Sequence, residues 1–566
     1  MLQQAKQPAF WNKIRTAEEY ALFRDDLLAM YKKIHSNATP AVSYRQYTRY
    51  YQDGNRLEFE QAYFSKRIRM NILALLALIY PQEPAYIDEL KEVIWAVCDE
   101  YTWALPAHVP FDRWDHSTLI DLFSSETGFA LSEIRELLGN RLGALIYRRI
   151  GTEIERRIIQ PFLTENFFWE QAENNWCAVC TCGVAAAFFY IRPELAKSQI
   201  SRFNDNLQAF LRSFQPDGVC REGVGYWNYG FGFFVSYASM LQEFTNGEIN
   251  LFSNDKVRRI ASFQHKAYLR DDITASFADG NVRSRHIIGI THFLKHLYPD
   301  DIKVLPTRFR ENRPLDISDV AFRARWTFEL RSILWYDPAL STEKAETTAE
   351  YYLSDSAWYI KKTPDYSFAA KAGNNDEPHN HNDIGSFIFA TDQGQLLCDL
   401  GCGEYTRDYF QPGTRYRILC NRSGGHSVPL IDGQEQKPGA EFDGTMSLQN
   451  GILTLEMSHA YAISELLSLQ RQFSFQENGV TLWDKFSFRN APLSVIERFI
   501  TQVCPEEEGS SLRIGQALLT CGAAWAPVVT PAVWANHIGQ NETVYLIDFL
   551  AKKPTDTFQL SIQLQP

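Results

Sequence analysis

Residues 374–387 read NNDEPHNHNDIGSF, and this stretch decides how the second half of the chain is interpreted. Polar and titratable side chains crowd it, and an apolar strand pattern follows at once. In an extended segment, residues i and i+2 point to the same side. His379 and His381 would then share one face, where one imidazole can accept a proton while the other binds a metal ion. An isolated His-x-His is more often an exposed polar turn, so the surrounding sequence has to decide.

The sequence after this pair predicts a β-hairpin. Residues 387–390 and 395–401 are strand-like and flank a turn that contains Gly394. Because a hairpin returns its second strand beside the start of the first, we expect Asp399 near His381. His426 is a third candidate ligand. Two imidazoles and a carboxylate suit a divalent metal ion, with zinc the first choice and manganese or another ion as alternatives. The competing interpretation is a buried Asp399 hydrogen-bonded to a histidine without metal.

Further motifs lie in both halves of the chain. The first half contains Asn174-Asn175-Trp176, Asp217-Gly218 and residues 222–230, EGVGYWNYG. The second half contains His379-Asn380-His381-Asn382-Asp383, the strand ending at Asp399, residues 401–405 (GCGEY), and His426 followed by Ile431-Asp432-Gly433. In this order, the motifs resemble those of the heparinase II/III-like polysaccharide lyases, a superfamily that includes glycosaminoglycan and alginate lyases.

The chain is long enough for two or three domains, since 566 residues exceed what one compact core usually holds. Apolar residues recur at helical spacing through the first half, and short strand patterns replace them after about residue 330. This change predicts helices followed by an antiparallel β-sandwich. The resemblance implies more: an N-terminal (α/α) toroid over residues 1–320 that carries the catalytic residues, then a β-sandwich over residues 321–566.

The resemblance also implies a reaction, the cleavage of uronic-acid-containing glycans by β-elimination, which leaves 4,5-unsaturated uronate ends. Such a site neutralises the uronate carboxylate, removes the C5 proton and protonates the leaving O4. Asn174 and Asn175 fit the first task because an amide donates without titrating, although asparagine is also a good helix N-cap. The resemblance favours Asn174, and Asn175 stays open. Tyr229 and Tyr226 compete for the proton transfer. Tyr229 is preferred because it precedes Gly230 at a predicted helix start and because its distance of 55 residues from Asn174 resembles the spacing in that family.

Other residues receive roles by the same resemblance. His379 is the base on the opposite face of the sugar or a second group that neutralises the carboxylate. A structural metal ion is expected on His381, Asp399 and His426. The expected substrate-binding residues are a tryptophan that stacks on sugar, three arginines that bind carboxylate or sulfate, and a tyrosine: Trp227, Arg221, Arg283, Arg415 and Tyr405.

Composition excludes several function classes. The net charge of -12 and the lack of a basic run argue against nucleic acid as a partner. No apolar run is long enough to span a membrane, and no secretion signal is visible, so a cytoplasmic location is expected. Cys177, Cys180 and Cys182 fall in an apolar helical pattern, which favours buried reduced thiols over a metal knuckle. The oligomeric state stays open, a homo-oligomer included.

Three alternatives accompany the first choice of a glycosaminoglycan such as hyaluronan, chondroitin or a heparin-like chain. The nearest alternative is an oligoalginate lyase. A different class is a glycoside hydrolase on an (α/α) toroid, which would need two opposed carboxylates, with Glu222 and Asp217 available. The last is a non-catalytic glycan-binding protein, whose function would not depend on Tyr229 or His379.

Overall fold

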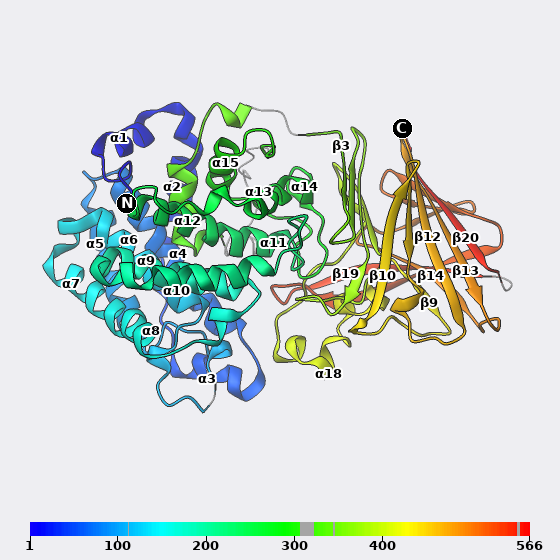
Figure 1. Ribbon diagram of the computed structural model, residues 1–566, viewed down its shortest axis with the longest axis horizontal. Coiled ribbons are helices and arrows are strands. Elements are labelled where there is room, and N and C mark those ends of the chain that lie inside the picture. Colours follow the sequence, from blue (N-terminus) through cyan, green and yellow to red (C-terminus); the bar gives the residue numbers. More distant parts are fainter. Residues whose placement is uncertain (111, 306–321, 343–345, 552–554, 566) are drawn as a thin grey trace. The chain divides into compact units, whose positions relative to one another are not determined.

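The computed structural model describes residues 1–110, 112–305, 322–342, 346–551 and 555–565 (Figure 1). The chain forms two compact units that interleave in sequence. The first comprises Met1–Ser213, Asn228–Arg258 and Arg285–Glu343, and the second comprises Phe214–Trp227, Arg259–Ser284 and Lys344–Pro566. The predicted boundary between residues 320 and 321 lies outside the described residues, and the linear division into two domains stays a prediction.

The predicted fold class, an (α/α) toroid and an antiparallel β-sandwich, is confirmed. The helices of the first unit are α1 (Pro8–Thr16), α2 (Ala21–His35), α3 (Tyr44–Asp53), α4 (Leu57–Ile79), α5 (Pro84–Cys98), α6 (Leu122–Leu138), α7 (Gly143–Ile154), α8 (Gln160–Thr164), α9 (Asn175–Ile191), α10 (Pro193–Arg212), α12 (Gly232–Phe244), α15 (Ile288–Leu297) and α17 (Trp326–Leu334), and α13 (Asp255–Ala261) begins in the first unit and ends in the second. Within the described part of the chain, none of the helices combines the length and the apolar character that crossing a membrane requires.

Helix α9 is buried on nearly all sides. Its sequence is apolar all round, which is typical of a helix inside a core rather than on a surface. Gly183 lets α6 approach closely, because a Cβ atom at this position would lie 2.6 Å from the carbonyl oxygen of Ser125. The predicted buried thiols are confirmed: Cys177, Cys180 and Cys182 lie in α9 as free cysteines.

The second unit is built from antiparallel sheets. The largest has the strand order β15 (Glu506–Glu508), β16 (Ser511–Ile514), β17 (Ala517–Cys521), β20 (Thr557–Leu564), β13 (Gly479–Phe488), β12 (Leu466–Gln476), β11 (Ile452–Glu456), β10 (Gly439–Gln449) and β6 (Gly373–Asn375). A second has the order β18 (Trp525–Ala535), β19 (Asn541–Ala551), β14 (Val495–Thr501) and β9 (Pro429–Ile431), and a third β3 (Ala349–Leu353), β4 (Trp358–Lys362), β5 (Ser367–Lys371), β7 (Phe387–Thr391) and β8 (Gly394–Leu397). The second unit also contains the short elements α11 (Val224–Tyr226), α14 (Phe263–Ala267), β1 (Tyr268–Arg270), β2 (Ile273–Thr274) and α18 (Pro412–Arg415).

One aromatic core joins the three large sheets. Phe368 of β5 lies 4.8 Å from Phe473 of β12 between ring centroids, and Phe387 of β7 lies 6.0 Å from Phe499 of β14. Burial of such rings is the main stabilising term for a sandwich of this kind. A separate buried ion pair joins Arg471 of β12 to Asp484 of β13 at 2.6 Å.

Candidate active site and metal cluster

His379 and His381 lie in a turn. No strand includes residues 376–386, and His379 has a left-handed backbone with φ of 57°. The expected strand-like alternation at this pair is therefore wrong. Side-chain hydrogen bonds hold the turn instead: Lys371 donates to Asp383 at 2.8 Å, and Arg415 donates to the carbonyl of Asn380 at 2.9 Å.

Both histidines nevertheless reach one carboxylate, that of the buried Asp279. The Nδ1 atom of His379 lies 2.5 Å from Oδ2, and the Nε2 atom of His381 lies 3.0 Å from Oδ1. Tyr405 donates to Oδ2 at 2.9 Å, and Tyr409 donates to Oδ1 at 2.5 Å. Burial alone would raise the pKa of Asp279, but the charge of His379, the hydrogen bonds from His379 and His381 and the charge of Arg415 hold it well below its usual range.

The other face of His379 meets a second acid and a tyrosine. Its Nε2 atom lies 3.4 Å from a carboxylate oxygen of Glu222. Its ring stacks on Tyr226 with 4.4 Å between ring centroids, and the hydroxyl of Tyr226 is 2.7 Å from that of Tyr405. Burial opposes the imidazolium, but Asp279 and Glu222 prevail and raise the pKa of His379. His379 thus lies among groups that can exchange protons.

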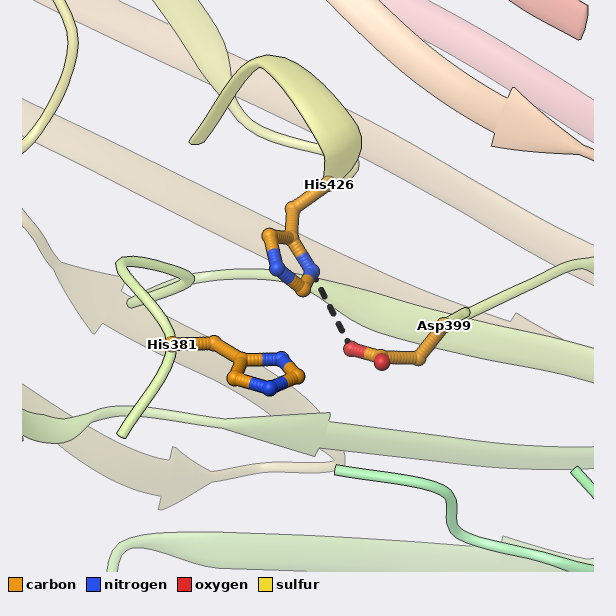
Figure 2. A group of neighbouring side chains, drawn as sticks. All are labelled: His381, Asp399 and His426. Carbon is orange, nitrogen blue, oxygen red and sulfur yellow. Dashed lines mark hydrogen bonds and ion pairs between the residues drawn. The ribbon is translucent and has the colours of Figure 1, made fainter. Parts of the chain in front are cut away.

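The three predicted metal ligands come together. The hairpin β7–β8 is confirmed, with Phe389 opposite Leu397, and it brings Asp399 back toward His381. His426 follows the turn Ser423–Gly425. One potential ligand atom from each of the three residues lies within 4.8 Å of the other two, and all three side chains are fully buried. Figure 2 shows the rings of His381 and His426 and the carboxylate of Asp399 around one common space.

The hydrogen bonds of this cluster leave lone pairs facing one another. His426 donates through Nε2 to the carbonyl of Cys420 at 2.8 Å, so its Nδ1 atom, 3.2 Å from Asp399, carries a lone pair in the neutral ring. The Nε2 atom of His381 is taken by Asp279, and within the described residues its buried Nδ1 atom has no hydrogen-bond partner. When both rings are neutral, the two ring nitrogens and the carboxylate oxygen can converge on one cation. When His426 is protonated, its Nδ1 atom instead donates to Asp399, the metal-free arrangement. With neutral rings, the donor set fits a divalent metal ion.

A separate cluster in the first unit surrounds Tyr229. Its hydroxyl donates to Oε1 of Glu126 on α6, and the guanidinium of Arg325 lies 3.9 Å from the centroid of its ring. Arg325 also lies 3.4 Å from Glu126. Burial and then Glu126 raise the pKa of Tyr229 well above its usual value, more than Arg325 lowers it, and burial raises the pKa of Glu126. Neither Glu126 nor Arg325 lies in a recognisable motif, so the sequence alone does not indicate these two partners.

The two asparagines differ in what they contact. Asn174 is the N-cap of α9, and its side-chain oxygen accepts a hydrogen bond from the backbone of Trp176 at 3.0 Å. Asn175 is buried and packs beside the helix start at Gly230, where an added Cβ atom would lie 3.2 Å from that of Asn175. Asn175 is therefore the one that adjoins the residue following Tyr229.

Comparison with known proteins identifies the fold. No protein-family model and no curated protein sequence matches this chain. Among solved structures, a mutant of heparan sulfate lyase HepC from Pedobacter heparinus matches with a TM-score of 0.61 and 12% identity, over 89% of this chain and 76% of that one. A heparinase III matches with a TM-score of 0.61 and 11% identity, over 100% and 93%. Chondroitin AC lyase from Streptomyces coelicolor A3, solved with chondroitin sulphate, matches with a TM-score of 0.56 and 10% identity, over 98% and 82%. This chain has the heparinase-type polysaccharide lyase fold.

Within this lyase fold, some of the predicted substrate-binding residues are otherwise engaged. Trp227 is fully buried and donates from its indole to the carbonyl of Ile260 at 2.7 Å, so its ring has no open face for a sugar and does not fit the expected platform. Arg283 pairs with Asp272 at 2.5 Å. Arg221 is half-buried and helps to offset the burial that raises the pKa of Glu377.

Arg415 and Asp217 hold backbone segments in place through hydrogen bonds. Arg415 donates to the backbone carbonyls of Asn380 and Tyr409, which ties down the histidine turn. Asp217, one of the two acids that a glycoside hydrolase would need, accepts hydrogen bonds from both the backbone and the hydroxyl of Ser356, at 2.8 and 2.7 Å. Its carboxylate therefore fixes a turn, which disfavours the hydrolase alternative.

Proposed function

We propose that this protein is a polysaccharide lyase that cleaves uronic-acid-containing glycans by β-elimination. The observation that supports the proposal is the lyase fold together with the acid–base clusters around Tyr229 and His379. By their names, two of the similar structures act on heparan sulfate and chondroitin. A glycosaminoglycan is therefore the proposed substrate, and oligoalginate is the alternative. Because the net charge of the chain is -12, we expect the anionic substrate to be bound by individual arginine side chains and amide donors rather than by a generally basic surface.

The first requirement of the reaction is to stabilise charge on the uronate carboxylate as the C5 proton leaves. An amide that donates from a buried position suits this task, because it needs no titration and little reorganisation. We assign this role to Asn175 because it is the buried amide beside Gly230, and Asn174, whose side-chain oxygen caps α9 while its NH₂ can still donate, is the alternative.

The second requirement is proton transfer between C5 and O4, which we assign to Tyr229. The phenol holds its proton tightly, as its raised pKa indicates. It can act as a base only after passing that proton to an acceptor, and Glu126 is already hydrogen-bonded to it. The phenolate then takes the C5 proton and delivers it to O4 as the bond to the leaving sugar breaks. Arg325 stabilises the phenolate before it takes the C5 proton and after it delivers that proton to O4, and Glu126 then returns its proton to Tyr229.

His379 keeps the two roles that the sequence leaves open, base or second neutraliser of the carboxylate. Its Nδ1 atom is held by Asp279, so Nε2 is the atom available for substrate. Tyr226 stacks on the ring and remains the alternative proton carrier. Tyr405 links Tyr226 to Asp279.

The metal proposal follows from the converging lone pairs. His381, Asp399 and His426 would hold a divalent ion, zinc by ligand type. When bound, the ion supplies positive charge that ties the histidine turn to the hairpin β7–β8. The proposed reaction passes no proton or bond through it.

The absorbance of the conjugated unsaturated uronate tests the reaction directly. The full chain is incubated separately with hyaluronan, chondroitin sulfate, heparan sulfate and alginate oligomers, with Tyr229→Phe and His379→Ala in parallel. A rise with one glycan that both substitutions abolish supports the proposal and identifies the sugar. New reducing ends without absorbance contradict it and favour hydrolysis, and binding without cleavage favours a glycan-binding protein.

A further inference from the structure

We propose that Asp279 is a positioning residue that holds His379 and His381 at the same time, and so couples the metal cluster to the placement of His379. The part that concerns catalysis rests on the proposed lyase function. The part that concerns metal binding does not. Asp279 was not among the candidate residues, because an Asp-Gly pair in sequence indicates only a turn.

The hydrogen bonds divide evenly between the two carboxylate oxygens. Oδ2 takes His379 and Tyr405, and Oδ1 takes His381 and Tyr409. Each oxygen thus receives one imidazole and one phenol. Bonds to a buried carboxylate are stronger than those between neutral groups and fix the orientation of their donors. A single side chain therefore sets the orientation of both rings.

The bond to His381 matters for metal binding. A proton on Nε2, donated to Asp279, leaves the lone pair on Nδ1, which is the buried nitrogen without a hydrogen-bond partner in the described structure. This is the tautomer a metal ligand needs, and a carboxylate behind a ligating histidine both fixes the ring and raises its basicity. Without Asp279, the proton can move to Nδ1 or the ring can turn away from Asp399 and His426.

The hydrogen bond between Asp279 and Nδ1 of His379 determines that Nε2 is the ring nitrogen that can contact the substrate. With Nδ1 on Asp279, the ring stacks on Tyr226 and Nε2 points toward Glu222. His379 has a left-handed backbone, which costs a non-glycine residue energy and persists only where its surroundings impose it. The bond to Asp279 is one such constraint.

The backbone around Asp279 is itself joined to the metal cluster. The hydroxyl of Ser276 donates to the carbonyl of Asp399 at 2.9 Å, and the carbonyl of Gly280 accepts from the backbone of Cys402 at 3.1 Å. A Cβ atom on Gly401 would lie 1.9 Å from the Gly280 carbonyl, so the two segments are in close contact. Contacts on both sides of Asp279, at Ser276 and at Gly280, therefore hold it relative to Asp399. A shift of residues 276–280 is expected to displace residues 399–402 as well.

Asp279→Asn in the full chain tests the coupling. The amide is nearly isosteric but accepts at one atom only, so the four donors cannot all be satisfied. Zn²⁺ affinity, measured by competition with a chromophoric chelator, is expected to fall about 10–100-fold. The kcat is expected to fall by a similar factor of about 10–100 while KM changes little, since the loss lies in positioning rather than in substrate binding.

Glu100→Gln is the matched control, because Glu100 is a buried carboxylate of the first unit that pairs with Lys66 and Arg67 at 2.8 and 2.6 Å. It is expected to lower thermal stability and to leave Zn²⁺ affinity and kcat unchanged. If Asp279→Asn does not fold, Tyr409→Phe removes one hydrogen bond to Oδ1 and should weaken Zn²⁺ binding in the same direction.

Each outcome decides the proposal. Wild-type Zn²⁺ affinity in Asp279→Asn, or equal losses in Asp279→Asn and Glu100→Gln, overturn it in favour of a purely structural aspartate. A wild-type chain that binds no Zn²⁺ overturns it as well. If the wild type binds Zn²⁺ but eliminates no glycan, the lyase function fails while the affinity comparison still decides the link between Asp279 and His381.

Discussion

Tyr229 is a half-buried phenol whose hydrogen bond runs to an acid rather than to the backbone. Tyr229→Phe keeps the ring against Arg325 and removes only the hydroxyl. Because the hydroxyl is the proposed proton carrier, the rate of elimination should fall by at least about 10²-fold, the usual contribution of general acid–base catalysis. Initial rates of unsaturated uronate formation, at saturating and at low glycan, measure the loss in kcat and in kcat/KM.

Tyr237→Phe is the control for that substitution. Tyr237 is buried on α12, and its hydroxyl donates to Asn204 at 2.9 Å. Removing this bond should cost about 1 kcal/mol of stability and leave the activity of the folded protein intact. Similar losses of activity in both variants would show that Tyr229 acts through packing alone.

At the scale of single residues, sequence reasoning found groups that stand in motifs and missed the groups that contact them. His381, Asp399 and His426 were expected together and lie together. Asp279 and Glu126 became visible only through the fold, because their contacts with His379 and Tyr229 span 100 and 103 residues. Hydrogen bonds over such separations have no local sequence pattern.

At the scale of elements, the contact between α6 and α9 is expected to be intolerant of any added atom. Gly183→Ala places a methyl group 2.6 Å from a backbone oxygen, which cannot rotate away. Overpacking of this kind costs about 1–3 kcal/mol or more, and the shift would also move Glu126 on α6. The thermal midpoint should fall, and activity should fall with it.

Gly151→Ala on α7 is the comparison. Its nearest neighbour would be the flexible side chain of Arg135 at 3.7 Å, an ordinary contact. Alanine favours a helix by about 1 kcal/mol over glycine, so this variant should be as stable as the wild type or more so. A destabilised Gly151→Ala protein together with an unaffected Gly183→Ala protein would contradict the packing argument.

The metal cluster joins three separate elements: the histidine turn, the end of the hairpin β7–β8 and the turn Ser423–Gly425. A ligand that binds only the folded state stabilises it, by about 4 kcal/mol at a thousand-fold excess over Kd. Stripping divalent ions with a chelator should therefore lower the thermal midpoint, and added Zn²⁺ should restore it. In Asp399→Asn the midpoint should no longer respond to the chelator; a full response would place the ion elsewhere.

Elements were predicted best where local chemistry decides them. The hairpin β7–β8 has a strong apolar pattern and a glycine at its turn, and it forms as expected. The His379–His381 segment was misjudged because its polar side chains bond to Lys371 and Arg415 from other elements, and these tertiary contacts override an extended backbone.

At the scale of the whole molecule, the order of helices and strands was predictable, but the interleaving of the two units was not. The second unit takes in Phe214–Trp227 and Arg259–Ser284, which precede most of its sheets by many residues. Hydrophobic periodicity identifies elements but not the unit to which each belongs. Both inserted segments supply residues around His379, namely Tyr226 and Asp279.

This interleaving makes a prediction about a fragment of residues 321–566, the sandwich as the sequence alone would delimit it. The fragment keeps His381, Asp399 and His426 but lacks Asp279. It also lacks the carbonyl of Thr274, which accepts from the buried Gln395 at 2.8 Å. Buried polar groups left unpaired cost about 1–3 kcal/mol each, and a histidine without its carboxylate partner binds metal more weakly. The fragment should therefore melt below the full chain and bind Zn²⁺ at least about tenfold more weakly, as circular dichroism and chelator competition would measure. A fragment with the Zn²⁺ affinity of the full chain would mean that the three ligands are oriented by the sandwich alone.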